Sequence, residues 1–415
     1  MKLLSVLLII ASLFIISCGT DATKQTTTNK NSTDEKASAT KVDTSSTPAA
    51  ANKEALVPCM NDSLNELTCL IAGKNIQNNS KILNHFFSHK NFKSFSANFE
   101  KTWLSYDSSR LKQLLKFKDE EIKKNVGATK KLFYPFSGPD ILYGYTFFPD
   151  ADEYIMMGLE PVGTLPIYDE KKIIPDSMKP YYKKINTSLF AILNFSFFRT
   201  ESMKEDLKNE ELDGTLHLLF LFLVRTGNSI CSAKPIIIDS SGRIQYIESF
   251  PKLQKKKALN KGIEITFSSL DKKTKKLYYY SLNLADGGLQ YNKGMMKYLT
   301  QMGTINTYLK GASYLMHKPY FSMIRNIILN QSNYVVQDDS GIAFKYFAKH
   351  EKWNYTFYGK YKKPISLFSE AYQADLDSAY KASGSKDIGF GIGYNFKDKN
   401  SNFMIAKKLH IAPLE

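Results

Sequence analysis

A helical period of apolar residues marks the start of the folded part of the chain. Within residues 81–126, large aromatic side chains recur at spacings of three and four, which is the period of one helix face. These side chains are Phe92, Phe95, Phe99 and Trp103. Asp107 to Ser109 then offer side chains that can cap a helix N-terminus, so the pattern predicts that a second helix begins there.

The clearest local pattern lies between Leu132 and Gly163. A strand-like run, LFYPF, is followed by a turn, SGPD, and by a helical run, ILYGYTFF. The sequence PDAD then ends the helix, and EYIMMGLEPVG forms a second strand-like run. This order of strand, short helix and strand predicts a parallel strand pair joined by a crossover.

Beyond Gly227, short strand-like runs alternate with turns and helices. The sequence DSSG lies between Ile236–Ile238 and RIQYI, which predicts an antiparallel hairpin. Further strand-like runs are IEITFSS, KLYYYSLNL, NYVVQ, IAFKYF and NYTFYGKY, and helices are predicted near 294–302, 321–330 and 367–382. The predicted fold class is therefore α+β, or mixed α/β. It has a helical start, a short parallel strand–helix–strand unit near 132–163, and antiparallel hairpins with helices in the second half.

The domain organisation is marked clearly only near the N-terminus. Residues 18–53 are rich in Thr, Ser, Lys, Asp, Asn and Ala and contain no aromatic residue, a composition that predicts a flexible tether. The rest divides into a mixed α/β region at 54–230 and an α+β region at 231–415, which form either two domains or one continuous domain. The apolar run at 216–224 is too short to cross a bilayer and is expected to be buried.

The first seventeen residues have the pattern of a secretory signal. Lys2 gives a positive start, Leu3 to Ile16 are almost all apolar, and Ser17 is small. Residues Ile15 to Cys18 resemble the lipobox of bacterial lipoproteins. In that family the signal is cut before the cysteine, whose sulfur carries a diacylglycerol while the new amino terminus is acylated. The resemblance implies a signal peptide at 1–17 and a lipid-anchored Cys18. The alternative is an ordinary cleaved signal with an incidental cysteine.

The resemblance also implies a location in the bacterial cell envelope. Thr20 stands where an aspartate would signal retention in the inner membrane, which favours the outer membrane. The stretches YPFSGPD, TFFPDA and QDDSGI in the body are similar to uncharacterised exported bacterial proteins. That similarity implies a shared fold and no assigned activity.

The chain carries a formal net charge of +16 at pH 7. A basic surface can attract polyanions such as acidic polysaccharide or lipid head groups. The codon usage of an AT-rich genome is the favoured explanation, because Lys, Asn, Ile, Phe and Tyr are abundant together. A candidate polyanion-binding patch comprises Lys252, Lys255, Lys256, Lys257, Lys261, Lys272, Lys273, Lys275 and Lys276.

Cysteine usage fits a protein outside the cytoplasm. With Cys18 lipidated, Cys59 and Cys69 are the natural disulfide pair because they close a short loop. Such a loop is worth about 3 kcal/mol in the chain-entropy model. Cys231 is then left over and is expected to be buried, although three cysteines leave the pairing open.

Two pairs of acidic residues are candidates for chemistry. Ser137 and Asp140 form a possible capping box, with Ser137 as the N-cap. Asp140 and Glu160 also lie at the carboxyl ends of the predicted parallel strands, where open sheets place ligands and where paired carboxylates can do acid–base work. Asp338 and Asp339 are either catalytic or part of a solvent-exposed turn.

Motifs for common cofactors are absent from the sequence. There is no nucleophile elbow, no phosphate loop and no paired C-x-x-C, and the His85–His89 pair lacks the glutamate of a zinc protease. No cofactor, metal or specific nucleic acid is therefore expected, and the expected partner is the membrane. The leading hypothesis is a lipid-anchored envelope protein with a binding or structural role. The alternatives are an envelope hydrolase and adhesion to an acidic polymer.

Overall fold

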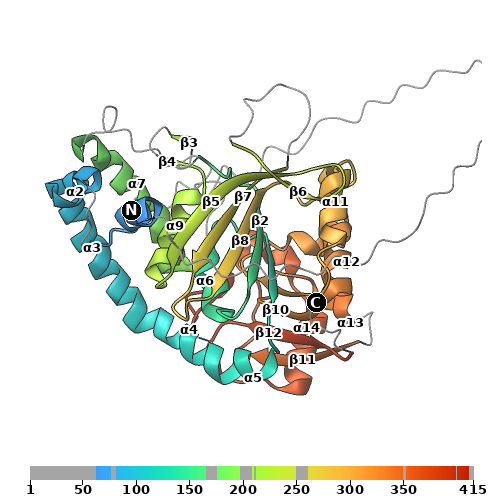
Figure 1. Ribbon diagram of the computed structural model, residues 1–415. Helices are drawn as coiled ribbons and strands as arrows, with labels where there is room; N and C mark the ends of the chain where they lie inside the picture. The colour runs from blue at the N-terminus through green and yellow to red at the C-terminus, as the bar shows by residue number, and fades with distance from the viewer. Residues whose placement is uncertain are drawn as a thin grey trace, which may run out of the picture. The chain divides into compact units, whose positions relative to one another are not determined.

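The computed structural model of the chain describes residues 62–75, 81–164, 175–196, 208–209, 212–248, 260–348, 352–398 and 400–410. The predicted signal peptide, Cys18, the tether at 18–53 and Cys59 lie outside these residues. The folded unit lies within residues 55–415. It is a mixed α+β structure, as the sequence predicts, and a single large sheet runs through it (Figure 1).

The sheet has ten strands in the order β11-β12-β10-β9-β1-β2-β8-β7-β5-β6. Their bounds are β1 (Lys131–Pro135), β2 (Glu153–Gly158), β5 (Ser229–Ile238), β6 (Ile244–Tyr246), β7 (Asn260–Ser268), β8 (Thr274–Ser281), β9 (Ile305–Leu309), β10 (Ser332–Gln337), β11 (Trp353–Tyr358) and β12 (Phe403–Lys408). A separate small sheet pairs β3 (Lys208–Asn209) with β4 (Leu212–Asp213). The five central strands, β10 to β8 in this order, are parallel, and the outer strands are antiparallel.

Helices cover both faces of the large sheet and form two apolar cores. One core contains side chains from α1 (Asp62–Ile71), α2 (Lys81–Ser88), α3 (Lys90–Tyr106), α4 (Lys112–Phe117), α6 (Ile141–Phe147), α7 (Met178–Phe195) and α9 (Leu216–Arg225). The other contains side chains from α10 (Asp286–Leu289), α11 (Lys293–Thr300), α12 (Ser322–Gln331), α13 (Phe344–Ala348) and α14 (Ala374–Ser383). Successive residues of β1 serve alternate cores, Leu132 and Tyr134 the first and Phe133 the second, so the central strands are buried on both faces.

The parallel strand–helix–strand unit is confirmed. Strand β1 pairs in parallel with β2, with Lys131 opposite Glu153, and α6 connects them. The predicted hairpin is confirmed as β5 and β6, and the aromatic face of α3 is buried. Strands from both sides of residue 230 share one sheet, so residues 54–230 and 231–415 do not form separate sheets.

The break predicted at Asp107 to Ser109 was wrong. The helical backbone continues from α3 through a π-turn (Asp107–Leu111), α4, a second π-turn (Lys118–Ile122) and α5 (Lys123–Asn125). The Ser108 and Ser109 hydroxyls donate hydrogen bonds to carbonyls three or four residues earlier rather than capping a new helix. Each π-turn contains a buried residue, Leu111 in the first and Ile122 in the second, so the buried face of the helix continues through both.

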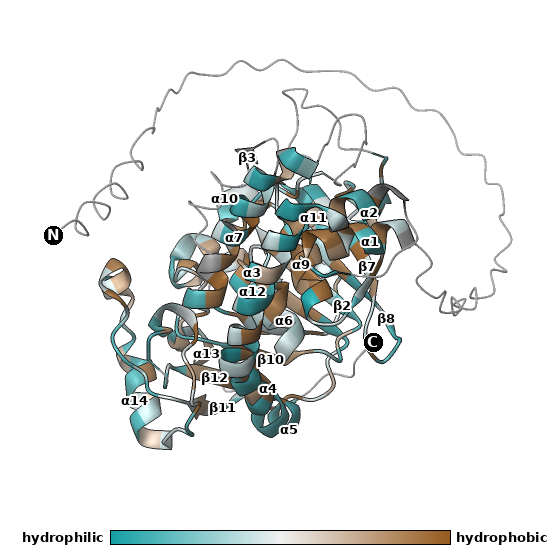
Figure 2. Cartoon of the chain, turned by 90° about the vertical axis from the view of Figure 1, so that its left-hand side faces the viewer, coloured by the Kyte–Doolittle hydropathy of each residue, from teal (hydrophilic) through white to brown (hydrophobic). Residues whose placement is uncertain are grey.

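Two further elements bear on the sequence predictions. The run IAFKYF, predicted as a strand, contains α13, so that prediction was wrong. The apolar run 216–224 forms α9, which is buried along its whole length and is drawn in brown in Figure 2. No helix within the described residues is long and apolar enough to span a bilayer.

The predicted disulfide between Cys59 and Cys69 was wrong. Cys69 lies in α1 as a free, buried thiol, whose burial raises its pKa. Cys231, at the start of β5, is disulfide-bonded instead. Since Cys69 is free, the partner of Cys231 lies outside the described residues.

Two neighbouring leucines in α4 test the burial of the long helix. The Leu114 side chain is 0 % exposed and Leu115 is 39 % exposed. Leu114→Ala is expected to lower the free energy of unfolding by about 2–5 kcal/mol, because the lost side chain leaves a cavity. Leu115→Ala is the matched control and should cost less than about 1 kcal/mol. Urea unfolding followed by circular dichroism measures both, and equal losses would contradict the packing of this helix.

Candidate functional site

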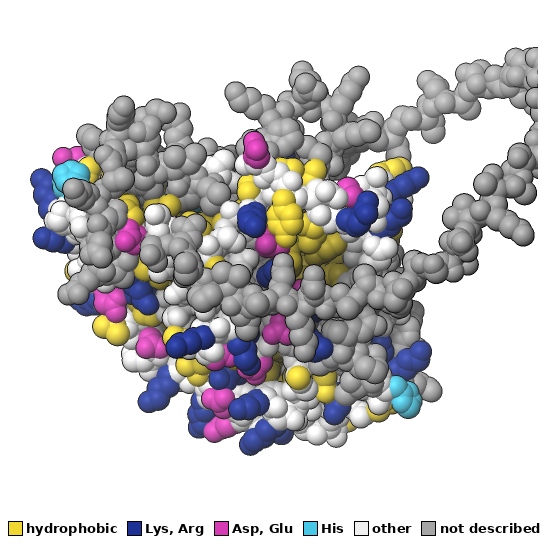
Figure 3. Space-filling model, viewed as in Figure 1, with side chains coloured by type: hydrophobic (Ala, Val, Ile, Leu, Met, Phe, Trp, Pro, Cys, Tyr) yellow, Lys and Arg dark blue, Asp and Glu magenta, His cyan; other side chains and the backbone are white. Residues whose placement is uncertain are grey.

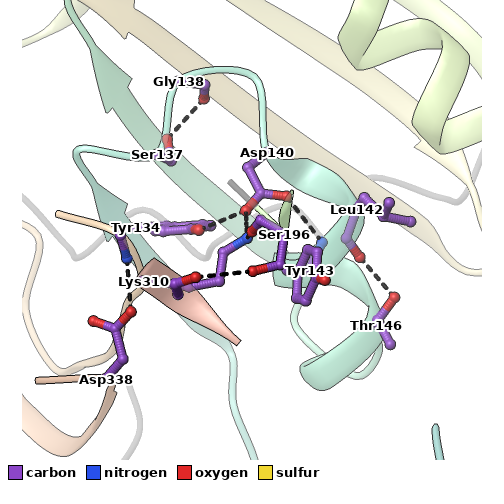
Figure 4. A network of polar contacts seen from close by, with 12 residues as sticks. Tyr134, Ser137, Gly138, Asp140, Leu142, Tyr143, Thr146, Ser196, Lys310 and Asp338 are labelled. Atoms are coloured by element: carbon purple, nitrogen blue, oxygen red, sulfur yellow. Dashed lines mark hydrogen bonds and ion pairs between the residues drawn. The ribbon is translucent and has the colours of Figure 1, made fainter. Parts of the chain in front are cut away.

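The crossover connections of the central sheet run in opposite directions from the neighbouring strands β1 and β9. Helix α6 connects β1 to β2 across one face of the sheet, and α12 connects β9 to β10 across the opposite face. The connections therefore leave adjacent strands in opposite directions. In open α/β sheets this divergence opens a crevice at the carboxyl ends of the strands, where ligands commonly bind. Asp140, Lys310 and Asp338 lie at this edge (Figure 4).

Asp140 caps the N-terminus of α6. Its Oδ1 accepts a hydrogen bond of 3.3 Å from the Tyr143 backbone N–H, and its Oδ2 accepts one of 2.7 Å from the Tyr134 hydroxyl. The predicted capping box was therefore wrong in register, because Asp140 itself is the N-cap. The Ser137 hydroxyl donates to the Gly138 carbonyl instead.

Lys310, directly after β9, is the buried partner of Asp140. Its Nζ lies 2.6 Å from Asp140 Oδ2 and donates to the Ser196 carbonyl, and it lies 3.5 Å from the centre of the Tyr143 ring. The side chains of Lys310 and Asp140 are only 1 % and 2 % exposed. Lys310 was not among the residues predicted from the sequence, because the strand INTYL before it contains two polar residues and does not read as a buried apolar run.

Burial and pairing act on this ion pair in opposite directions. Burial raises the pKa of Asp140, while Lys310 and the Tyr134 hydroxyl counteract part of that rise. Burial lowers the pKa of Lys310, and the Asp140 carboxylate counteracts part of that drop. A charge of either residue alone would be very costly at this depth, so each side chain depends on the other.

Asp338 follows β10 and is also buried, so the prediction of a solvent-exposed turn was wrong. Its Oδ2 accepts a hydrogen bond of 2.9 Å from the Gly311 N–H, and its Oδ1 accepts one of 3.0 Å from the Ser340 N–H and another from the Ser340 hydroxyl. Burial raises its pKa. A Cβ at Gly393 would collide with Oδ2, so only glycine fits there.

Asp339 points to a different set of partners. Its Oδ2 accepts from the Tyr314 hydroxyl at 2.8 Å, and its Oδ1 accepts from Asn402 Nδ2 at 3.0 Å. Burial, and next the neighbouring Asp338, raise the pKa of Asp339 to about 7. Both aspartates line a cavity of about 10 Å³, which has room for about one water molecule.

Glu160 lies two residues after β2 and is 2 % exposed. The Tyr279 hydroxyl lies 3.1 Å from its carbonyl oxygen and 3.4 Å from Oε2. A Cβ at Gly138 would lie 3.5 Å from Oε2, so Glu160 lies beside the β1–α6 turn. Within the described parts of the chain, no hydrogen bond or ion pair joins its carboxylate to Asp140 or Asp338. The structure therefore brings Asp140 and Asp338 to Lys310 but leaves Glu160 in a separate contact.

Three lysines of the predicted patch make local contacts in the structure. Lys252, Lys255, Lys256 and Lys257 lie outside the described residues. Lys275 is buried and donates a hydrogen bond of 2.8 Å to the Ala151 carbonyl, so its prediction as a polyanion contact was wrong. Lys273 lies 3.5 Å from Asp271 and Lys276 lies 3.7 Å from Glu264. On the face shown in Figure 3, basic side chains are dispersed and acidic ones lie among them.

Comparisons of this chain with protein-family models, with curated proteins and with solved structures yield no match. The buried polar residues at the carboxyl edge of the sheet include Asp140, Lys310, Asp338 and Asp339. These residues form a buried network in which each carboxylate already accepts hydrogen bonds from other groups of the protein.

A double-mutant cycle on Asp140 and Lys310 tests the buried ion pair. Asp140→Asn keeps a capping side chain but leaves the lysine charge unpaired, and Lys310→Met leaves the carboxylate unpaired. Each is expected to cost about 3–5 kcal/mol of unfolding free energy. The unfolding free energy lost in the double variant should be smaller than the sum of the two single losses, and the difference should exceed about 1 kcal/mol. Urea unfolding measures all four proteins.

The exposed pair Asp377–Lys381, at 2.6 Å on α14, is the matched control for that cycle. The same substitutions there should give a coupling of about 0.3–0.5 kcal/mol. A coupling between Asp140 and Lys310 as small as that of the surface pair would contradict a structural role for the buried pair.

The raised pKa of Asp339 predicts a pH dependence of stability. Its carboxyl is protonated in the folded protein up to about pH 7 and in the unfolded chain only below about pH 3.9. The folded state therefore binds more protons between these values, and stability falls as the pH rises through them. Asp339→Asn, which is neutral throughout, should gain stability relative to the wild type between pH 5 and pH 8. A constant difference in urea midpoints across this range would refute the assignment.

Proposed function

We propose that this chain is a lipid-anchored protein of the bacterial envelope with a binding or structural role, held to the outer membrane through Cys18. The lipobox-like residues Ile15 to Cys18 support the anchor, and the composition of residues 18–53 supports a tether. A chain of that length has a typical reach of roughly 30–35 Å. The tether would hold the folded body clear of the lipid head groups.

The burial of the candidate carboxylates carries the choice of a binding or structural role over hydrolysis. Asp140, Glu160 and Asp338 are each 2 % exposed, and Asp339 is 4 % exposed. A hydrolase needs a carboxyl group within hydrogen-bond reach of both water and substrate. The cavity beside Asp338 and Asp339 has only about 10 Å³, too little for a substrate. The hydrolase alternative therefore has less support than a structural role for the same carboxylates.

Metabolic labelling with an alkyne fatty acid tests the anchor. The wild type should carry the label and sediment with membranes, because Cys18 would hold several acyl chains in the bilayer. Cys18→Ser should lose the label and the membrane association. Cys69→Ala, which removes a buried free thiol, is the matched control and should remain labelled. An unlabelled wild type, or mature protein in the culture fluid, would overturn the proposed anchor.

A further inference from the structure

A groove lies between α3 and α7, the two helices that are labelled in Figure 2. Its volume is about 550 Å³, within the range of ligand sites in proteins. It is lined by Asn91, Ser94, Phe95, Asn98, Lys179, Tyr182, Lys183, Asn186 and Thr187. Its volume is much larger than the roughly 10 Å³ of the cavity beside Asp338 and Asp339, and it is open to solvent.

The sequence periodicity of the two helices builds this groove. Asn91, Ser94 and Asn98 recur at spacings of three and four on α3, so they form one wall about 10 Å long. Lys179 and Lys183 stand one turn apart on α7 and belong to the opposite wall. Each wall is therefore a continuous row of polar side chains.

Two stacked aromatic rings form a rigid floor between these walls. The Phe95 and Tyr182 ring centres lie 4.4 Å apart, with planes inclined by 12°. Both side chains are more than nine-tenths buried, which fixes the separation of α3 and α7. The walls are thus held in place before any ligand arrives, which reduces the entropy lost on binding.

Within the part of the chain that the structure describes, most of the polar side chains in the walls have no hydrogen-bond or ion-pair partner. Ser94, Asn98, Lys179, Lys183 and Asn186 are exposed, and within the described residues their side chains make no hydrogen bond or ion pair. None of the described residues that line the groove carries a carboxylate, and Asp176 nearby lies 3.4 Å from His89. Among the described residues, the groove therefore presents two lysines without an ion-pair partner beside amides and hydroxyls that make no side-chain hydrogen bond.

We propose that the groove between α3 and α7 binds an acidic oligosaccharide, which gives the binding role proposed above a site and a ligand class. Amides both donate and accept hydrogen bonds, and sugar hydroxyls do the same, so the walls match a polyhydroxylated ligand. The carboxylates of the sugar acids pair with Lys179 and Lys183.

A partner helix fits the same groove less well. A helix satisfies its own backbone groups and binds through apolar side chains that fill apolar pockets. Among the nine described residues that line the groove, only Phe95 and Tyr182 have aromatic side chains, and both are more than nine-tenths buried. A docked helix would leave the amides of Asn98 and Asn186 without partners, which costs binding free energy.

Isothermal titration of the full-length protein in detergent with trigalacturonate tests the proposal. The methyl-esterified trimer serves as the uncharged counterpart. Trigalacturonate is expected to bind, and both the methyl ester and the variant K179Q/K183Q should bind about tenfold or more weakly. Binding should also weaken with added salt, because the lysines are exposed.

The variant K293Q/K297Q is the matched control, since Lys293 and Lys297 are exposed, one turn apart, on α11. It changes the net charge equally and should bind like the wild type, within about twofold. Equal weakening by both double variants, no binding of trigalacturonate, or binding of an acidic helical peptide in place of the sugar would each overturn the proposal. None of these outcomes changes the fatty-acid labelling of Cys18, so the anchor and the groove fail separately.

Discussion

The ion pair between Asp140 and Lys310 is the interaction on which the centre of this fold depends. It joins the start of α6 to the end of β9, at the point where the two halves of the sheet diverge. Removing either charge would leave the other charge buried and unpaired, which is strongly destabilising. Tyr134 and Ser196 complete the bonding of the pair, and Asp338 continues the network toward β10. A crevice that many α/β proteins leave open for a ligand is here filled by the protein's own charges.

Local patterns predicted the elements whose causes are local. The spacing of Phe92, Phe95 and Phe99 predicted the buried face of α3, and turn chemistry at Asp239 to Gly242 predicted the β5–β6 hairpin. The parallel pair β1–β2 followed from one strand–helix–strand run. The residues that determine each of these features lie close together in the sequence, so a local pattern is enough to predict it.

The network at the carboxyl edge could not be predicted in the same way. Asp140 and Lys310 are far apart in the sequence, and only the strand order brings β1 beside β9. The sequence therefore pointed to Asp140 and Asp338 but missed the lysine between them. The burial of Asp339 was also missed, because Asp-Asp-Ser-Gly has the composition of an exposed turn while its environment is set by Tyr314 and Asn402.

The position of β12 has a consequence for biosynthesis. This strand is the last one described in the chain, yet it lies inside the sheet, between β10 and β11, rather than at an edge. Because β10 and β11 each pair with β12, that side of the sheet cannot form until residues 403–408 have left the ribosome. A chain assembled in this order keeps the facing edges of β10 and β11 unpaired until β12 is available, so this side of the sheet forms only after the described strands that precede it.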